Sequence, residues 1–330
     1  MNRTTAPDRS VVAAARPTAA PVGQEFDTPA RRRGRRTPRS GANLAGWTLM
    51  SPALALLLIM TVVPTIYLVR ASLRNDTLLG IGGGFVGLQN YRDVLTDPNE
   101  LHALLRTAFF VVVAVALELL LGMLLAVPLA AQSRSNNLAA TLMLLPFAVT
   151  PVVSAMIFRE LLSPTTGWVD YYMGRVGLGA HFDWLGGSNT AWLAIIGLDV
   201  WQWTPFVALI LMAGLQSLPP EPSEAAAIDG ASNWQTFRFI TLPMLMPFVA
   251  IALTLRTIQA FKTFDSFAVL TNGGPGTSTE IINLNIYRVA LQSFRIGAAS
   301  ALAMVFLIFL SLLVPLLLRV AGRDPEEGAA

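Results

Sequence analysis

Long apolar stretches, separated by polar segments, run along most of the chain. A helix needs about 20 apolar residues to cross about 30 Å of hydrocarbon, and several stretches of the sequence are long enough. They cover residues 47–68, 108–129, 138–162, 191–215, 245–269 and 298–320. The pattern predicts an all-α polytopic membrane protein with six transmembrane helices. Its membrane domain is expected to span residues 43–322, followed by a short tail at 323–330.

Prolines interrupt several of these stretches. Pro64, Pro146, Pro151 and Pro205 all lie inside predicted helices. A proline in a helix leaves a backbone carbonyl without its hydrogen-bond partner, and lipid cannot supply a replacement. We therefore expect kinked helices that pack against one another in a bundle.

The segment before the first apolar stretch, residues 1–42, is polar and basic, with nine arginines. Such a composition cannot bury enough apolar surface to fold alone, which predicts a disordered tail. Basic residues next to a span favour the cytosolic side, so we expect a cytosolic amino terminus, and six crossings return the carboxyl terminus to the cytosol. A nucleic-acid-binding arm is the alternative interpretation of the arginines, and we predict no nucleic-acid partner.

The composition agrees with a membrane protein and excludes some chemistry. Hydrophobic residues make up 54% of the 330 and charged residues 13%, which is more apolar than a soluble domain of this size usually is. The absence of cysteine excludes disulfides, thiol catalysis and thiolate metal sites. The two histidines, His102 and His181, are far apart in the chain, which argues against a histidine metal centre. We expect this chain to bind neither a metal nor a cofactor.

The connection between the fourth and fifth stretches, residues 217–243, predicts a small helix-turn-helix. Prolines end the preceding span, and Ser223 offers an N-cap to a short helix with Glu224 in its first turn. Gly230 supplies a break where the chain can turn into a second helix, which Pro243 is expected to separate from the fifth span. Three alanines, residues 225–227, would give the first helix a slim surface for a partner.

This segment resembles a known signature. Glu224-Ala225-Ala226, followed after three residues by Gly230 and then by Ile240, Leu242 and Pro243, resembles the EAA motif of membrane subunits of binding-protein-dependent ABC importers. The resemblance implies a type I importer permease fold with a cytosolic coupling helix that docks into an ATPase subunit. The expected coupling residues are Glu224, Ala225, Ala226, Asp229, Gly230, Leu242 and Pro243.

The resemblance extends over most of residues 45–320. Segments 87–91, 145–147, 203–206, 261–265 and 270–276 look like the carbohydrate-type branch, which includes maltose, trehalose, oligosaccharide and glycerol-3-phosphate importers. It implies a permease of the bacterial cytoplasmic membrane, paired with a second permease subunit as a heterodimer. The further implied partners are two ATP-binding cassette subunits, an extracytoplasmic solute-binding protein and a sugar-like solute. The arginine-rich tail is not part of the family pattern.

Three charged residues lie within the apolar stretches, where a charge is costly: Glu118, Asp199 and Arg256. On a helical projection Gln259 and Thr263 lie within about 60° of Arg256, with Lys262 and Ser266 further round the same side. This polar stripe is interpreted in two ways. It lines a translocation path, or Arg256 pairs with Glu118 or Asp199 inside the bundle while Lys262 reaches the membrane interface.

A Trp-Gln-Trp run, residues 201–203, has the same two interpretations. Aromatic faces stack on sugars and amides bind their hydroxyls, which suits a sugar path, but the same residues also suit packing between helices. The expected substrate-path residues are Trp201, Gln202, Trp203, Arg256, Gln259 and Thr263.

The chain lacks the means to hydrolyse ATP. The glycine-rich segment 273–276 has no following Lys-Ser or Lys-Thr, so we interpret it as a turn, and no phosphate-binding loop occurs elsewhere. ATP must therefore be used by separate subunits, and this chain is not expected to be an enzyme. The alternative function is an ion-gradient-driven secondary transporter, which would need paired intramembrane carboxylates or inverted repeats. A membrane enzyme would need a clustered acid and base. The sequence reveals none of these features.

Overall fold

The computed structural model describes residues 40–80, 83–131, 133–177 and 182–321. The predicted basic tail lies almost wholly outside these ranges, as does most of the predicted carboxyl-terminal tail. In the described part the regular secondary structure is helical, apart from one isolated bridge between Arg74 and Phe85. The helices are α1 (Ser40–Ser72), α2 (Gln89–Thr96), α3 (Pro98–Leu129), α4 (Arg134–Met143), α5 (Leu145–Ala148), α6 (Pro151–Leu161), α7 (Trp168–Arg175), α8 (Ser188–Ser217), α9 (Glu221–Ile228), α10 (Asn233–Thr236), the π-helix η1 (Phe237–Thr241), α11 (Leu242–Phe261), α12 (Asp265–Leu270), α13 (Ile282–Tyr287), the π-helix η2 (Arg288–Gln292) and α14 (Ile296–Ala321).

Long apolar helices dominate the described residues, in agreement with the predicted membrane class. Those long enough to cross a membrane are Met50–Ser72, Pro98–Leu129, Ser188–Ser217, Asn233–Phe261 and Ile296–Leu316. A bent pair, Ser135–Ala148 and Pro151–Leu161, counts as a sixth span if it crosses as one unit. The fifth predicted stretch continued to residue 269, whereas α11 ends at Phe261 and the chain turns into the short α12.

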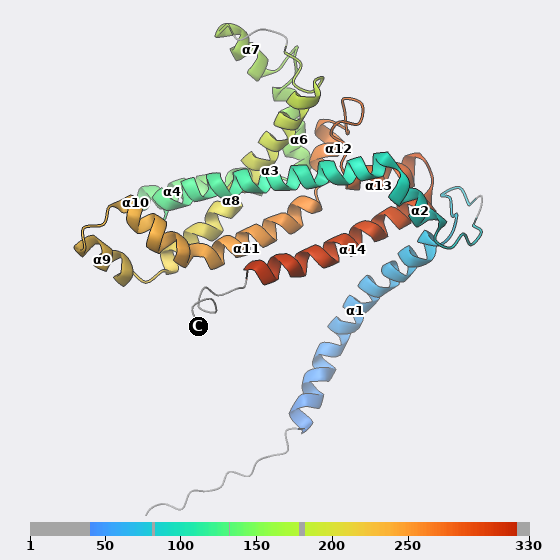
Figure 1. The fold of residues 1–330 in the computed structure, drawn as a ribbon, viewed down its shortest axis with the longest axis horizontal. Coiled ribbons are helices and arrows are strands. Elements are labelled where there is room, and N and C mark those ends of the chain that lie inside the picture. The colour runs from blue at the N-terminus through green and yellow to red at the C-terminus, as the bar shows by residue number, and fades with distance from the viewer. Residues whose placement is uncertain (1–39, 81–82, 132, 178–181, 322–330) are drawn as a thin grey trace, which may run out of the picture. The chain divides into compact units, whose positions relative to one another are not determined.

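The chain divides into two compact units, one up to Leu57 and one from Leu58 onward. The described part of the first unit is the amino-terminal half of α1. In the second unit α3 packs against α8 and α11, and α14 packs against α11. Figure 1 shows α3, α11 and α14 side by side, with α9 and α10 beyond one end of these helices and α2 and α13 at the other.

Glycines allow the long helices to approach closely. A Cβ on Gly122 of α3 would lie 2.8 Å from Val207 Cγ1 of α8, and one on Gly214 of α8 would lie 2.6 Å from Phe248 Cγ of α11. Both distances are shorter than carbon atoms tolerate. Small residues at such crossings are typical of membrane helices, whose association depends on close packing.

The third span is broken. Helix α5 ends at Ala148, α6 begins at Pro151, and the two halves are bent by 90°. Pro151 begins a helix without loss, because the first residues of a helix have no intrahelical partner for their N–H groups. The Gln202 side chain of α8 donates to the Val149 carbonyl at 2.7 Å, so a neighbouring helix satisfies a backbone group that the break leaves free. The expected kink is therefore present as a break, and Figure 1 shows α6 leading away from α3 and α11 toward α7.

Polar contacts hold the first loop against the end of α1. Asn90 of α2 donates to the carbonyls of Ser72 and Arg74 at 2.8 and 2.9 Å. The Tyr91 hydroxyl lies 2.7 Å from the Ser72 hydroxyl. These contacts hold α2 against the carboxyl-terminal end of α1.

Candidate functional site

The EAA segment ends helix α9 with a Schellman motif, in which two backbone bonds close the last helical turn. The Ala231 N–H donates to the Ala226 carbonyl at 2.9 Å, and the Gly230 N–H donates to the Ala227 carbonyl at 3.2 Å. Gly230 has a φ of +81°, in the left-handed region that this motif requires and that glycine adopts without strain. Ala226 and Gly230 of the signature therefore both belong to the turn that ends α9.

A second cap starts the helix that follows. Ser232 and Gln235 form a capping box, in which the Ser232 hydroxyl accepts from the Gln235 N–H and the Gln235 side chain accepts from the Ser232 N–H. The chain then continues through α10, η1 and α11 as one long apolar helix, Asn233–Phe261. The predicted helix-turn-helix is thus formed by α9, the turn at Gly230 and the start of this long helix.

Two details of the predicted segment are wrong. Ser223 lies inside α9 and caps nothing, because the helix already begins at Glu221, directly after Pro220. Pro243 does not separate the second helix from the fifth span, because it follows a π-helical turn in which the Leu242 N–H reaches back to the Phe237 carbonyl. The wider turn lets the helix continue past the proline.

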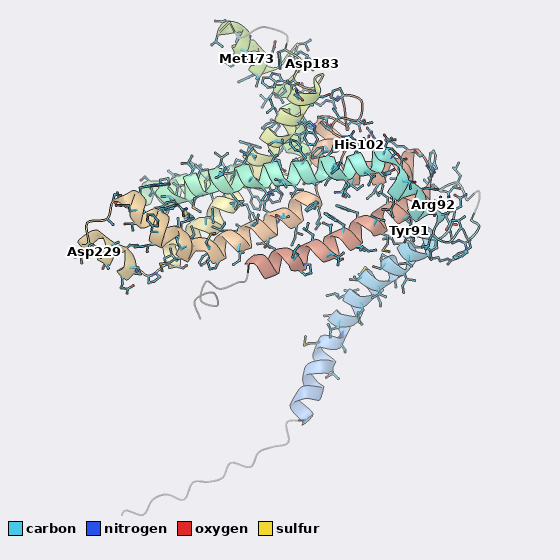
Figure 2. The ribbon with its side chains drawn as sticks, in the orientation of Figure 1. Tyr91, Arg92, His102, Met173, Asp183 and Asp229 are labelled. Carbon is cyan, nitrogen blue, oxygen red and sulfur yellow. The ribbon has the colours of Figure 1, made fainter. Side chains whose placement is uncertain are left out.

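The surface of this segment is more apolar than the sequence suggested. Glu224, Ala225 and Asp229 are exposed, while Ala226 is buried. Three large side chains that the sequence analysis did not single out are also exposed: Ile228 (87%), Trp234 (69%) and Phe239 (72%). The signal for them in the sequence is the presence of apolar residues near Gly230 in an otherwise polar connection. Figure 2 places Asp229 at the end of the molecule formed by α9 and α10, far from the labelled Tyr91 and Arg92.

A buried ionic cluster joins α3, α8 and α11. The side chains of Glu118, Asp199 and Arg256 are 0%, 2% and 0% exposed. Arg256 Nε lies 2.5 Å from Glu118 Oε2, and Arg256 Nη2 donates to Glu118 Oε1 at 2.8 Å and also to Asp199 Oδ2. Of the two interpretations of Arg256, the structure therefore contains the pairing one, with both carboxylates instead of one. Glu118 and Asp199 lie 81 positions apart in the chain, so nothing in the sequence marks the two carboxylates as neighbours.

A group of aromatic rings lies next to the ionic cluster. The Arg256 guanidinium carbon lies 4.8 Å from the centre of the Trp203 ring, a cation–π geometry. Trp203 also contacts Phe147 of α5 edge to face at 5.4 Å, and Phe147 stacks on Phe206 at 5.2 Å. This aromatic group therefore connects the ionic cluster to the break in the third span.

The expected path residues do not form one cluster. Trp201 is 41% exposed and packs on Phe158 of α6, while Gln202 reaches the break at Val149 and Trp203 reaches Arg256. Successive helical residues point about 100° apart, which separates the three side chains of the run.

The rest of the polar stripe lies toward the end of α11. Gln259 keeps a buried Oε1 without a hydrogen-bond partner, and Thr263 is half-buried. Lys262 is exposed, and Ser266 is buried. Asn283 donates to the carbonyls of Phe261 and Thr263 at 2.8 and 3.0 Å and so closes the end of the helix. Among the described residues, no group of three or more His, Cys, Asp or Glu side chains has metal-site geometry.

Several apolar helices around buried charges, with an exposed helical loop at one end, define a multi-span membrane protein. The family model for the binding-protein-dependent transport system inner membrane component matches residues 118–324. The trehalose/maltose transport system permease protein of Thermococcus litoralis is 36% identical over 269 residues, covering 81% of this chain and 90% of that protein. The sulfoquinovosyl glycerol transport system permease protein of Agrobacterium fabrum is 34% identical over 267 residues, covering 80% and 86%.

A solved structure has the same fold. A chain of a bacterial alginate ABC transporter, in complex with an alginate pentasaccharide-bound periplasmic protein, superposes with a TM-score of 0.73 at 22% identity and covers 86% of this chain and 96% of that one. The protein belongs to the family of binding-protein-dependent transport system inner membrane components. It is the permease of an ABC importer, a transport subunit and not an enzyme.

Proposed function

We propose that this permease forms part of the path for a sugar or sugar-like solute and is driven by separate ATPase subunits through the α9 segment. The observation that carries the proposal is the shape of that segment: a helix closed by a Schellman turn, with Ile228, Trp234 and Phe239 exposed beside it. Large apolar and aromatic side chains exposed together are typical of protein-binding surfaces. Coupling is assigned to Glu224, Ala225, Ala226, Asp229, Gly230, Leu242 and Pro243.

The partners follow from the family. Two ATP-binding cassette subunits hydrolyse ATP, one of them against α9, and a second permease subunit completes a heterodimer. A solute-binding protein delivers the solute to the opposite end of the bundle. The α9 end faces the cytosol, both termini are cytosolic, and this chain itself holds no cofactor.

The solute class is supported by the relatives, whose names include a disaccharide and a sugar-glycerol conjugate. Within the chain, the path is proposed to run past Trp201, Gln202, Trp203, Gln259 and Thr263. Gln202 Oε1 and Gln259 Oε1 are buried acceptors that no protein donor uses, and the proposal assigns them to solute hydroxyls. Arg256 lies beside this path with its guanidinium held by two carboxylates.

The test is a substitution at the turn. Gly230→Ala places a Cβ on a residue with φ +81°, and the left-handed conformation costs other residues about 1–2 kcal/mol. We expect the turn to shift, trehalose uptake by the reconstituted transporter to fall by about an order of magnitude, and ATP hydrolysis to continue. Glu224→Lys, which reverses an exposed charge on α9, should act in the same direction.

A matched control exists in Gly80→Ala. Gly80 also has a positive φ, +72°, and a Cβ there would meet nothing within 4 Å, but it lies in the loop after α1. Trehalose, maltose and glycerol-3-phosphate would be offered as separate probes. Wild-type uptake in both α9 variants, or uptake that survives depletion of ATP, would remove the proposal and favour an ion-driven transporter.

A further inference from the structure

The buried ionic cluster lies on the three helices that the proposed coupling segment would have to move. We propose that Glu118, Asp199 and Arg256 are positioning residues of transport, which fasten α3, α8 and α11 into one rigid unit that carries the displacement of α9 to the path. The proposal rests on the coupling role of α9 proposed above. It assigns to the cluster a mechanical role distinct from contact with solute.

The chain connects α9 directly to two members of the unit. Helix α8 ends at Ser217, four residues before α9 begins, and the long helix that contains α11 starts at Asn233, five residues after α9 ends. A displaced α9 therefore pulls on α8 and α11 at once. Without a cross-connection, the two helices are free to respond separately.

The cluster supplies that cross-connection far from α9. Asp199 lies 18 residues before the end of α8, and Arg256 lies 23 residues after Asn233. At 1.5 Å per helical residue these separations are about 27 and 35 Å. A fastening at that distance prevents the far ends of the two helices from tilting apart, and Glu118 adds α3 to the same fastening point.

Close packing fills the interval between the cluster and α9. Gly122 lies one helical turn after Glu118 and meets Val207 of α8, while Gly214 of α8 meets Phe248 of α11. Apolar packing is non-directional, and it allows the small shear movements by which packed helices shift past one another. Ion pairs with fixed donor and acceptor positions do not, and breaking a buried pair leaves an uncompensated charge. The cluster therefore fixes the register of helices that glycine contacts hold together.

The place for relative movement is the break in the third span. Residues 149–150 lie between α5 and α6, outside either helix. Gln202 of α8 binds the Val149 carbonyl, so the pivot is attached to the rigid unit while α6 continues at 90° beyond it. Such residues at the ends of helices are typical hinges.

Spin-label distances test this arrangement without touching the cluster. The chain has no cysteine, so cysteines introduced two at a time at exposed positions give specific pairs of labels. The positions are Val112 on α3, Leu193 on α8, Ile251 on α11 and Met156 on α6. In the complete transporter, with and without an ATP analogue, the distances among Val112, Leu193 and Ile251 should stay the same while those to Met156 change. A change among the first three, or no change at Met156, overturns the proposal.

A triple variant tests whether the ion pairs hold the three helices in place or only neutralise one another. Glu118→Leu, Asp199→Leu and Arg256→Met together remove every charge and keep an apolar contact. We expect an assembled complex that hydrolyses ATP but takes up trehalose at least tenfold less per ATP, because the helices now slide. Wild-type uptake would overturn the proposal. Thr254→Ala, a buried substitution on α11 outside the cluster, is the control and should transport normally. If the Gly230→Ala variant transports like wild type, the proposed coupling role of α9 fails, whatever the triple variant does.

Discussion

Arg256 is an instance of how a charge is accommodated between apolar helices. Its guanidinium is fully buried, two carboxylates bind one edge of it, and Trp203 covers a face. Its Nη1 has no hydrogen-bond partner, and Nε, 2.5 Å from Glu118 Oε2, contacts that carboxylate as an ion pair. Each neighbour comes from a different position on α3 or α8, so the charge is stable only when all three helices are in place. A single residue here depends on the packing of a large part of the molecule.

Glycine substitutions give a prediction at the same scale. Gly122→Ala should destabilise the protein, because its Cβ would lie 2.8 Å from Val207 Cγ1 and 3.2 Å from the Ala208 backbone nitrogen, and overpacking costs about 1–3 kcal/mol. Gly197→Ala on α8 meets nothing within 4 Å and should be neutral or stabilising by up to about 1 kcal/mol, since alanine favours helix. Thermal unfolding of the two variants in detergent compares them. Equal melting temperatures would contradict the close approach of α3 and α8.

Helix α9 and the start of the long helix after it form the element on which the proposed function depends. The Schellman turn and the capping box account for Ala226, Gly230, Ser232 and Gln235 by backbone hydrogen bonds within the segment. These residues therefore determine the shape of the loop. Ile228, Trp234 and Phe239 are exposed, and the proposed function assigns them to contact with the ATPase subunit.

A substitution of Trp234 tests whether the exposed side chains bind the ATPase subunit. Trp234→Ala should weaken binding of the ATPase subunit by about 2 kcal/mol, or about 30-fold, if the tryptophan is an anchor of the interface. Trp168 of α7 is a matched control, since it is 70% exposed where Trp234 is 69% exposed but belongs to another segment. Trp168→Ala should leave ATPase binding unchanged. Binding of the purified ATPase to the permease complex in nanodiscs measures both, and equal affinities would place the interface elsewhere.

Local patterns predicted the elements better than their junctions. The apolar stretches and the turn at Gly230 depend on nearby residues, so the sequence was sufficient for them. The continuation of the helix past Pro243 depends on a π turn over Phe237–Thr241, which no proline rule anticipates. At the 90° break a carbonyl is bonded by Gln202 of another helix, and the ionic cluster requires residues up to 138 positions apart to meet. The contacts at the break and in the cluster are tertiary, and a single sequence does not display them.

For the whole molecule, the central expectation is a fixed orientation in the membrane. Ile228 and Phe85 are 87% and 74% exposed. Ile228 is the last residue of α9 and Phe85 lies in the loop after α1, and the proposed topology places the two on opposite sides. In this cysteine-free chain, Phe85→Cys should react with a membrane-impermeant maleimide in intact cells from which any outer membrane has been removed. Ile228→Cys should react only after lysis. The reverse pattern would invert the topology and separate α9 from any cytosolic ATPase.

The ionic cluster also has a consequence for how the protein is made. Glu118 is synthesised 138 residues before the arginine that neutralises it, and Asp199 is also synthesised earlier. During translation, both acidic side chains enter the membrane while their counter-charge is still absent. Until the fifth span is made, these carboxyl groups must be hydrated, bound by another protein or protonated, and a nascent chain that stops before the fifth span would leave them without their arginine.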